Sequence, residues 1–503
     1  MKSLPLLSLL VFAPAVGALV LALLRSASDA TSRWLGLLFS FSTLALTAVV
    51  IAGFDPQAPG LQFVENVPWI ASLGAAYHLG LDGMSLLLVL LTGLVAPASL
   101  AATWHDSRQP RLHAMCLLLL QSAALGVFLA QDFLPWFLFW ELSLVPAFFL
   151  IKIWGGPSAT RAAYQFFTYT MTGSAFMLAA FAALYQVAGT LDFARLAEIG
   201  TSGELASALG AWNVAVFVGV LVGLAVKAPL FPLHTWLPEA YAEAPAGTSM
   251  FLTAVMSKMG VYGFVRILWP IFPAELRACA SPLLWLALGG VVFGALAAIR
   301  QRDLKRMIAY SSLNHVSYCL LALFAIAAAA ETTPPATQAA LVGLLLQMFN
   351  HGLSASALFF GAAMLARRNA ERRGLDEFGG VRTSMPVFAG LFGIALFSSL
   401  GLPGLNGFVG EFLIFRGVFG LVPWAGAVAL IGLLATAWFL LTAWQKIFHG
   451  PQRGTVATFS DVSRLELFTL LPGVLLMLAL GLAPQVLTQF INPLVARWVE
   501  VLP

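Results

Sequence analysis

Long apolar runs separated by short polar stretches fill most of the chain. A helix needs roughly 20 mostly apolar residues to cross a bilayer, so this pattern predicts an all-α, multi-pass membrane protein. The first run is longer than the core of a typical cleaved signal peptide, so we expect it to remain as a span. We expect fourteen spanning helices, over residues 4–24, 33–53, 83–103, 112–131, 133–153, 161–188, 212–237, 246–268, 281–299, 307–330, 338–366, 386–420, 424–447 and 467–490.

Basic residues lie almost entirely on one side of these spans. With the N-terminus outside, 18 of the 26 lysines and arginines fall in cytoplasmic loops or at their edges, and 4 fall on the opposite face. Because an excess of positive charge marks cytoplasmic loops, we expect both termini on the periplasmic side of a bacterial inner membrane.

Two polar stretches are longer than the other loops. Residues 54–82 have room for a short periplasmic hairpin or helix, and residues 367–385 carry five arginines on the cytoplasmic side. We expect the arginine-rich loop to serve orientation or contact with a partner.

The composition excludes most other classes of protein. Of 503 residues, 60% are hydrophobic and 10% are charged, whereas about 25% of residues are charged in soluble domains. A cytosolic enzyme, a nucleic-acid-binding protein and a secreted scaffold are therefore excluded. The cysteines Cys116, Cys279 and Cys319 form no CxxC pair, and no nucleotide or metalloprotease motif is present, so we expect no cofactor or metal in this chain.

Four charged residues lie well inside predicted spans, namely Glu141, Lys227, Lys258 and Glu411. Lipid does not solvate charges, so an ionisable residue in a span is a candidate functional residue. Arg266 and Arg416 lie near span ends, where we expect their side chains to reach the membrane surface.

Proline and glycine interrupt two of the spans. Pro229 and Pro232 follow Lys227 in the seventh span, and Pro403 and Gly404 precede Glu411 in the twelfth. Each proline removes a backbone donor, and broken helices mark ion pathways in transporters.

The two interruptions are 174 residues apart, measured from Pro229 to Pro403, and Glu141 and His315 have the same separation. This indicates two five-helix units, spans 4–8 and 9–13, and the odd number of crossings places the second upside down. We therefore divide the chain into helices 1–3 with their loop (1–111), the first repeat (112–268), the second repeat (281–447) and a C-terminal loop and helix (448–503).

Three histidines lie in spans or interrupted segments: His234, His315 and His351. Imidazole exchanges protons near neutral pH through two nitrogens. Placed between two lysines and a glutamate, these histidines fit a proton relay.

At these residues the sequence resembles a known family. The segments FLFWELSLVP, VKAPLFPLHTWLPEA, RDLKRMIAYSSLNH, FNHGLSASALFF and LGLPGLNGFVGEF, with the earlier HLGLDGMSLLLVLLTG, are similar to the antiporter-like proton pumps of bacterial NADH:quinone oxidoreductase (complex I). The M type, the counterpart of mitochondrial subunit 4, fits best, because it has glutamate at the position of Glu411 where the L and N types have lysine. The sequence also ends 13 residues after the last span, without the long lateral helix of the L type.

The resemblance implies a role for each buried charge. Glu141 and Lys227 would form the coupling ion pair, and Lys258 would be the central relay. His315 and His351 would continue a hydrated axis, and Glu411 would close it toward the far side.

The resemblance also implies partners. FMN, iron–sulfur clusters, NADH and quinone would be bound by other subunits, and the chain would contact other antiporter-like subunits, the peripheral redox arm and lipid, with no nucleic acid. Related chains serve multisubunit Na+/H+ antiporters, membrane-bound hydrogenases and CO2-uptake complexes, and these remain the alternatives.

Three residues depart from the family pattern. Tyr241 stands where a histidine is common, and Asn314 and Ser317 flank His315 where serine and glycine are commoner. These departures concern the subtype more than the proton pathway.

Overall fold

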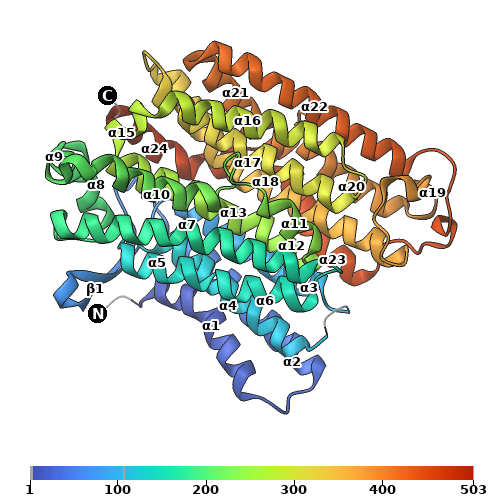
Figure 1. Ribbon diagram of the computed structural model, residues 1–503. Coiled ribbons are helices and arrows are strands. Elements are labelled where there is room, and N and C mark those ends of the chain that lie inside the picture. The colour runs from blue at the N-terminus through green and yellow to red at the C-terminus, as the bar shows by residue number, and fades with distance from the viewer. Residues whose placement is uncertain (1–3, 106–107, 502–503) are drawn as a thin grey trace.

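A computed structural model describes residues 4–105 and 108–501, which form one bundle of long helices (Figure 1). In this part of the chain, 13 helices are long and apolar enough to cross a membrane. They are α1 (Leu6–Leu23), α2 (Asp29–Gly53), α3 (Gly83–Ala102), α4 (Pro110–Leu129), α5–α6 (Phe133–Trp154), α7 (Ala159–Ala188), α9–α10 (Glu204–Lys227), α12–α14 (Ala246–Ile271), α16 (Ala280–Ile299), α17 (Leu304–Ala328), α18 (Pro334–Arg368), α22 (Pro423–Phe448) and α23 (Arg464–Leu482). The chain is an all-α multi-pass membrane protein.

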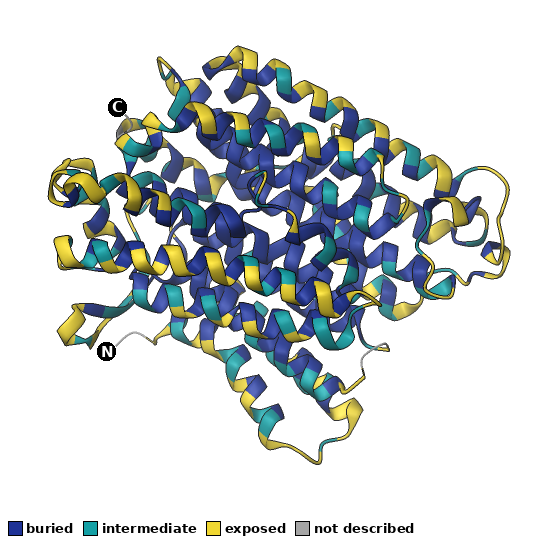
Figure 2. Ribbon diagram, in the orientation of Figure 1, coloured by how far each residue is buried: buried dark blue, intermediate teal, exposed yellow. Residues whose placement is uncertain are grey.

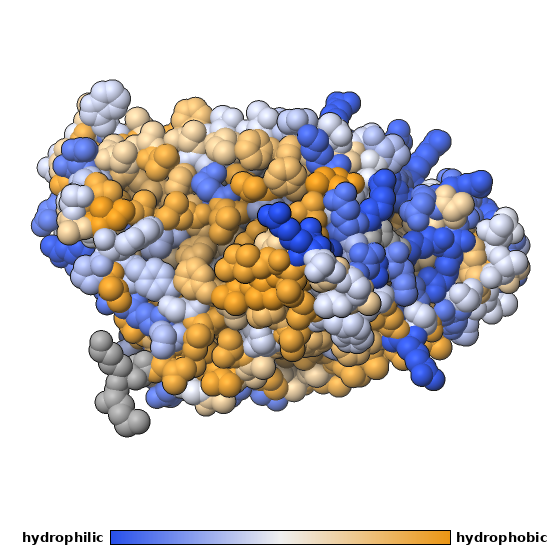
Figure 3. Space-filling view, turned by 90° about the horizontal axis from the view of Figure 1, so that it is seen from below, coloured by the Kyte–Doolittle hydropathy of each residue, from blue (hydrophilic) through white to orange (hydrophobic). Residues whose placement is uncertain are grey.

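Burial sorts these helices into a centre and a periphery (Figure 2). The most apolar stretch of α18 is completely buried and that of α12–α14 is 94% buried, whereas only 33% of the corresponding stretches of α7 and α23 is buried. Apolar side chains fill the middle of the face seen in Figure 3, and polar side chains gather mostly at the end that carries α19 (Val381–Ser384). An apolar middle with polar ends is what a bilayer requires of a protein surface.

The long loop between α2 and α3 contains a two-stranded antiparallel hairpin, β1 (Gln62–Ile70) and β2 (Ala75–Leu81), joined by the short helix η1 (Ala71–Leu73). The hairpin lies at the opposite end of the bundle from α19 (Figure 1). The short helix α8 (Phe193–Thr201) lies at the hairpin's end, where Asp192 at its start pairs with His78 of β2. We call this the outer end, after the orientation that the sequence predicts.

The two interrupted regions are not helical. Helix α10 (Asn213–Lys227) ends before Pro229 and Pro232, and α11 (Trp236–Glu243) begins after them. The indole of Trp236 donates to the carbonyl of Val226 at 3.0 Å, which satisfies an acceptor that the break leaves free.

In the twelfth region, α20 (Pro386–Ser399) and α21 (Asn406–Leu421) replace the single span expected over 386–420. Gly401 and Gly404 between them have φ angles of +79° and +92°, a backbone conformation that favours glycine. Because α20 has only 14 residues, it falls below the length of a spanning helix, and the count of long apolar helices is 13.

The C-terminal region also differs from the expected span over 467–490. Helix α23 ends at Leu482, and a separate helix, α24 (Gln485–Val501), begins after Pro484, a residue that cannot donate to the preceding turn. Helix α24 packs against α3 and α18.

The helix of residues 246–271 contains two π-helical turns, η3 (Leu252–Met256) and η4 (Phe264–Leu268). They flank α13 (Ser257–Gly263), which carries Lys258. Such turns release backbone groups from regular pairing and occur often at functional sites.

Candidate proton pathway

Four of the charged or titratable residues singled out in the sequence form a continuous buried row. The Lys258 Nζ lies 2.7 Å from the His351 Nδ1, and the His351 ring stacks on the His315 ring with centroids 5.2 Å apart. The His315 Nε2 lies 3.3 Å from the Glu411 Oε1. Each of the four residues is at most 4% exposed. The row joins α13, α18, α17 and α21, which are far apart in sequence.

The His315 ring lies between two backbone carbonyls. Its Nδ1 lies 2.7 Å from the Ser311 carbonyl oxygen and its Nε2 lies 2.9 Å from the Ser399 carbonyl oxygen. Carbonyl oxygens only accept hydrogen bonds. Both nitrogens of His315 thus face acceptor oxygens, and Nε2 also faces the Glu411 carboxyl group. By contrast, the Nδ1 of His351 faces the donor Lys258 and must accept.

Helix breaks and π turns supply acceptors to this row. The Ser399 carbonyl, which is hydrogen-bonded to the His315 Nε2, belongs to the last residue of α20. The Lys258 Nζ donates at 2.6 Å to the carbonyl of Thr253, inside the π turn η3. Irregular backbone thus lines the buried polar groups and satisfies them.

Gly401 makes room for Glu411. A Cβ atom at position 401 would lie 2.7 Å from the Glu411 Oε2. The other carboxylate oxygen, Oε1, accepts from Gln347 Nε2 at 3.3 Å.

Lys227 and Glu141 form a second group at the break in the seventh region. The Lys227 Nζ donates to the Ser143 hydroxyl at 2.9 Å and lies 4.7 Å from the centre of the Trp140 ring. The Glu141 carboxylate lies beside the Ser174 hydroxyl, and its Oε1 is buried without a hydrogen-bond partner among the described residues. Lys227 is therefore hydrogen-bonded to Ser143, and the described residues show no direct ion pair between Lys227 and Glu141.

His234 lies apart from both groups. Its ring stacks on Phe231 with centroids 5.4 Å apart and packs against Phe293 at 5.2 Å, and its Nδ1 is buried without a hydrogen-bond partner in the part of the chain that the structure describes. The structure does not connect His234 to either lysine by a hydrogen bond.

The three departures from the family pattern are well accommodated. The Tyr241 hydroxyl donates to the Leu252 carbonyl at 2.9 Å, at the start of the π turn η3. The Asn314 amide donates to the Val291 carbonyl at 2.7 Å, and the Ser317 hydroxyl donates to a carbonyl one turn earlier on α17.

We expected the Arg266 side chain to reach the membrane surface, but it does not. Its guanidinium binds the Asp82 carboxylate and donates to the Tyr262 hydroxyl at 3.3 Å, with the side chain 15% exposed. Asp82 is available because it caps α3, accepting from the Ser85 N–H, and has a second oxygen to offer. Arg416 is exposed, as expected.

Several partners of these groups were not found from the sequence. Gln347 lies one helical turn before His351, and Ser143 lies two residues after Glu141. A polar residue one turn from a buried titratable group, such as Gln347, is a usable signal, whereas the two-residue spacing of Ser143 is not. The backbone acceptors Thr253 and Ser399 give no signal, since every residue has a carbonyl.

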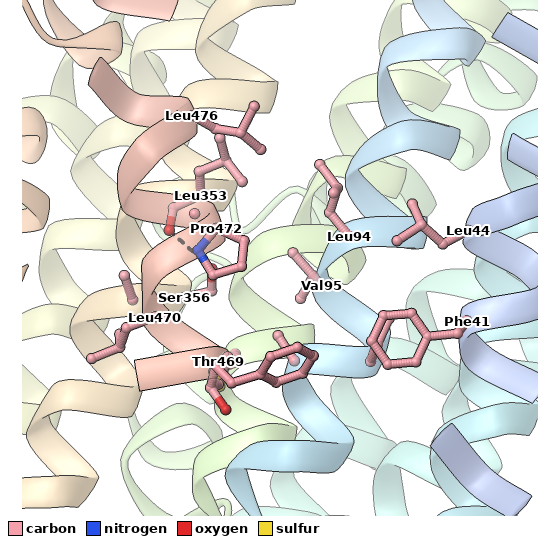
Figure 4. A pocket seen from close by; sticks show the side chains of 16 residues that line it. Phe41, Leu44, Leu94, Val95, Leu353, Ser356, Thr469, Leu470, Pro472 and Leu476 are labelled. Atoms are coloured by element: carbon pink, nitrogen blue, oxygen red, sulfur yellow. Dashed lines mark hydrogen bonds between the residues drawn. The ribbon is translucent and has the colours of Figure 1, made fainter. Parts of the chain in front are cut away.

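An apolar pocket with a volume of about 230 Å³ opens between α2, α3, α18 and α23 (Figure 4). No titratable side chain lines it, so it is separate from the buried row. Among the described residues, no group of three or more His, Cys, Asp or Glu side chains is arranged to hold a metal ion.

A family model, relatives by sequence and a solved structure all indicate the same protein family. The family model described as NADH:quinone oxidoreductase/Mrp antiporter matches residues 130–436. Subunit M of the NADH-quinone oxidoreductase of Rhodobacter capsulatus is 35% identical over 506 residues, covering 98% of this chain and 96% of that protein. Subunit M of the F(420)H(2) dehydrogenase of Methanosarcina mazei is 35% identical over 504 residues, 97% of each chain. A chain in the solved structure of respiratory complex I from Thermus thermophilus with bound NADH has a TM-score of 0.87 and 29% identity, covering 99% of this chain and 100% of that one.

Proposed function

The chain belongs to the NADH:quinone oxidoreductase/Mrp antiporter family, and from this premise we infer that it is the M-type, proton-translocating subunit in the membrane arm of a NADH:quinone oxidoreductase, complex I. It is the antiporter-like, non-redox subunit of a translocase. Electron transfer in other subunits drives it.

The observation that carries this function is the buried row Lys258–His351–His315–Glu411. We propose that protons move along this row and that Lys227 and Glu141 control their entry. A buried ammonium is stable only with a compensating partner. When Glu141 is near, Lys227 keeps its proton, and when Glu141 is drawn toward a neighbouring subunit, Lys227 releases the proton. No hydrogen bond between the described residues joins Lys227 to Lys258. This transfer therefore requires water to carry the proton from one lysine to the other.

The energies involved are sufficient. Moving one charge across 150 mV costs about 3.5 kcal/mol. Removing one partner of a buried ion pair costs about 3–5 kcal/mol, so withdrawing the Glu141 carboxylate would supply enough.

We also propose the finer architecture expected from the sequence. Helices α20 and α21 together form one broken span, which brings the number of spans to fourteen. Residues 112–268 and 281–447 are inverted repeats, and segments 1–111 and 448–503 flank them. The two broken regions, 228–235 and 400–405, support this division because each lies next to a buried charge. Both termini and the hairpin face the periplasm.

The partners follow from the same premise. We propose that the chain packs against other antiporter-like subunits and that the peripheral arm holds FMN, iron–sulfur clusters and the NADH site, with quinone bound on a partner subunit. The relative from Methanosarcina is named for F(420)H(2), so the electron donor is the part of the proposal that most needs a direct test.

The test is a mild-detergent pull-down of the tagged chain, with mass spectrometry and an NADH–ferricyanide assay on the eluate. Flavin and iron–sulfur subunits with NADH oxidation are the expected result. Co-purification of antiporter subunits alone, without NADH oxidation, would replace complex I with a Na+/H+ antiporter.

A further inference from the structure

A second polar line leaves Lys258, toward the outer end of the bundle. Lys258, Tyr262 and Arg266 follow one another at intervals of four residues, which places neighbours on one helix face. Tyr262 is completely buried. Beyond Arg266 lies Asp82, at the start of α3 beside the hairpin.

Direct contacts join Tyr262, Arg266 and Asp82, whereas Lys258 is related to Tyr262 only by its place on the same helix face. The Tyr262 hydroxyl donates to the Phe128 carbonyl at 3.1 Å and accepts from Arg266 Nε at 3.3 Å. The Arg266 guanidinium lies 5.5 Å from the centre of the Tyr262 ring and binds the Asp82 carboxylate. The Arg266 and Asp82 side chains are 15% and 5% exposed.

These groups differ in their ability to pass on a proton. A tyrosine hydroxyl both donates and accepts hydrogen bonds, and a carboxylate accepts, so Tyr262 and Asp82 could each pass a proton on. A guanidinium donates from every nitrogen, has no acceptor and does not lose its proton in proteins. Arg266 stands between the two and interrupts the line.

We propose that Arg266, positioned by Asp82, is the outer seal of Lys258: it closes the short route from Lys258 to the outer surface, so that protons leave Lys258 only through His351. This rests on the proposed function, because a seal matters only if Lys258 carries protons. An arginine that excludes protons from a polar pore is a known device in membrane channels. Without such a seal, a proton reaching Lys258 would exchange with the outer side and dissipate the gradient.

The alternative is a purely structural ion pair that ties α3 to the helix of Lys258. Passive proton leak separates the two, since glutamine in place of Arg266 both donates and accepts. The native complex and its variants are reconstituted in phosphatidylcholine–phosphatidylglycerol vesicles containing a pH dye. A potassium diffusion potential set with valinomycin then drives protons without NADH.

We expect Arg266→Gln to raise the leak by about tenfold, which corresponds to about 1.4 kcal/mol of barrier. The double variant Asp82→Asn/Arg266→Gln leaves no unpaired buried charge, so it replaces the single variant if that variant fails to assemble. It should leak to the same extent. Adding Tyr262→Phe to either should return the leak to the native level, because the hydroxyl is the step between Lys258 and position 266. Arg416→Gln, at an exposed arginine, is the matched control.

A native-level leak in assembled variants would overturn the seal, and so would a leak that Tyr262→Phe does not suppress, since that indicates general loosening. Tyr262→Phe alone should keep proton pumping within about twofold of native, because the route is closed. A loss of pumping at unchanged NADH oxidation would mean that the route is used. Failure of the proposed function is distinguishable: the native complex itself would then lack NADH oxidation.

Discussion

His315 has the most polar partners in the row, with two carbonyl oxygens and the Glu411 carboxyl group around it. A buried cation is tolerated only when its protons are accepted in this way. Next to it, His351 accepts from Lys258. Under the proposed function, a proton advances step by step along this row of neighbouring titratable groups.

Glu411→Gln should uncouple this row. The substitution keeps the shape of the side chain but removes the carboxyl group that faces the His315 Nε2, so the row loses its last titratable member. We expect protons pumped per NADH to fall steeply while the complex still assembles, as measured by dye acidification in vesicles. Glu331→Gln, at an exposed glutamate, is the control, and equal pumping by the two variants would contradict the role of Glu411.

Ser143→Ala tests the direct partner of Lys227. Losing a hydrogen bond to a buried charged group costs about 1.5–3 kcal/mol, so the initial rate of NADH-driven pumping should fall by about tenfold. Ser143→Thr retains the hydroxyl and should restore most of the rate. If alanine pumps as fast as serine, Lys227 does not depend on this contact.

The sequence predicted the residues with formal charge and missed most of their partners. Glu141, Lys227, Lys258 and Glu411 are conspicuous because lipid does not solvate them. Serine and glutamine are ordinary in spans, and a backbone carbonyl becomes a ligand only where the helix is irregular. The contact between Lys227 and Ser143 depends on how α5–α6 packs against α10, which a single sequence does not specify.

At the scale of elements, irregular helices position the row. The break after α20 presents the Ser399 carbonyl to His315, and the π turn η3 presents the Thr253 carbonyl to Lys258. Proline and glycine in the sequence predict the two helix breaks. The π turns contain no proline or glycine, so no sequence pattern predicted them, and the end of α23 before α24 was misplaced for lack of a clear change in hydropathy.

Close packing between the backbones of α20 and α21 stabilises the break in the twelfth region. A Cβ atom at Gly407 would lie 1.9 Å from the Ser398 carbonyl oxygen, whereas nothing lies within 4 Å of one at Gly390 on α20. Gly407→Ala should therefore destabilise the protein by about 1–3 kcal/mol and lower the temperature at which the purified complex aggregates. Gly390→Ala should not, and equal melting of both variants would show that the break adapts freely.

At the scale of the whole molecule, the distribution of charge sets the orientation. The surface has an apolar middle and polar ends (Figure 3). The excess of basic residues at the end that carries α19 favours the proposal that this end faces the cytoplasm. The outer end then carries the hairpin and the pair of Asp192 with His78, 2.8 Å apart. Burial alone would raise the pKa of Asp192, but the hydrogen bond from His78 holds that pKa below its usual value.

Cysteine labelling tests this orientation. Gln57, in the loop before β1, and Arg372, in the loop between α18 and α19, are both exposed. The elements β1 and α19 lie at opposite ends of the bundle (Figure 1). A membrane-impermeant maleimide should label Gln57→Cys in intact cells and Arg372→Cys only after the membrane is permeabilised. Cys116 and Cys319 are buried but Cys279 is partly exposed, so labelling of the native chain is subtracted as the background. The reverse pattern of labelling would invert the topology.

The most direct test of the central claim is the number of protons pumped per NADH oxidised by a complex carrying Lys258→Met. Methionine fills nearly the same volume but cannot carry a proton, so the row is cut at its first member. We predict that the assembled complex still oxidises NADH, that the proton-to-NADH ratio falls well below the native value, and that Arg416→Gln leaves the ratio unchanged. A native ratio in the Lys258→Met complex would contradict proton transfer through this row.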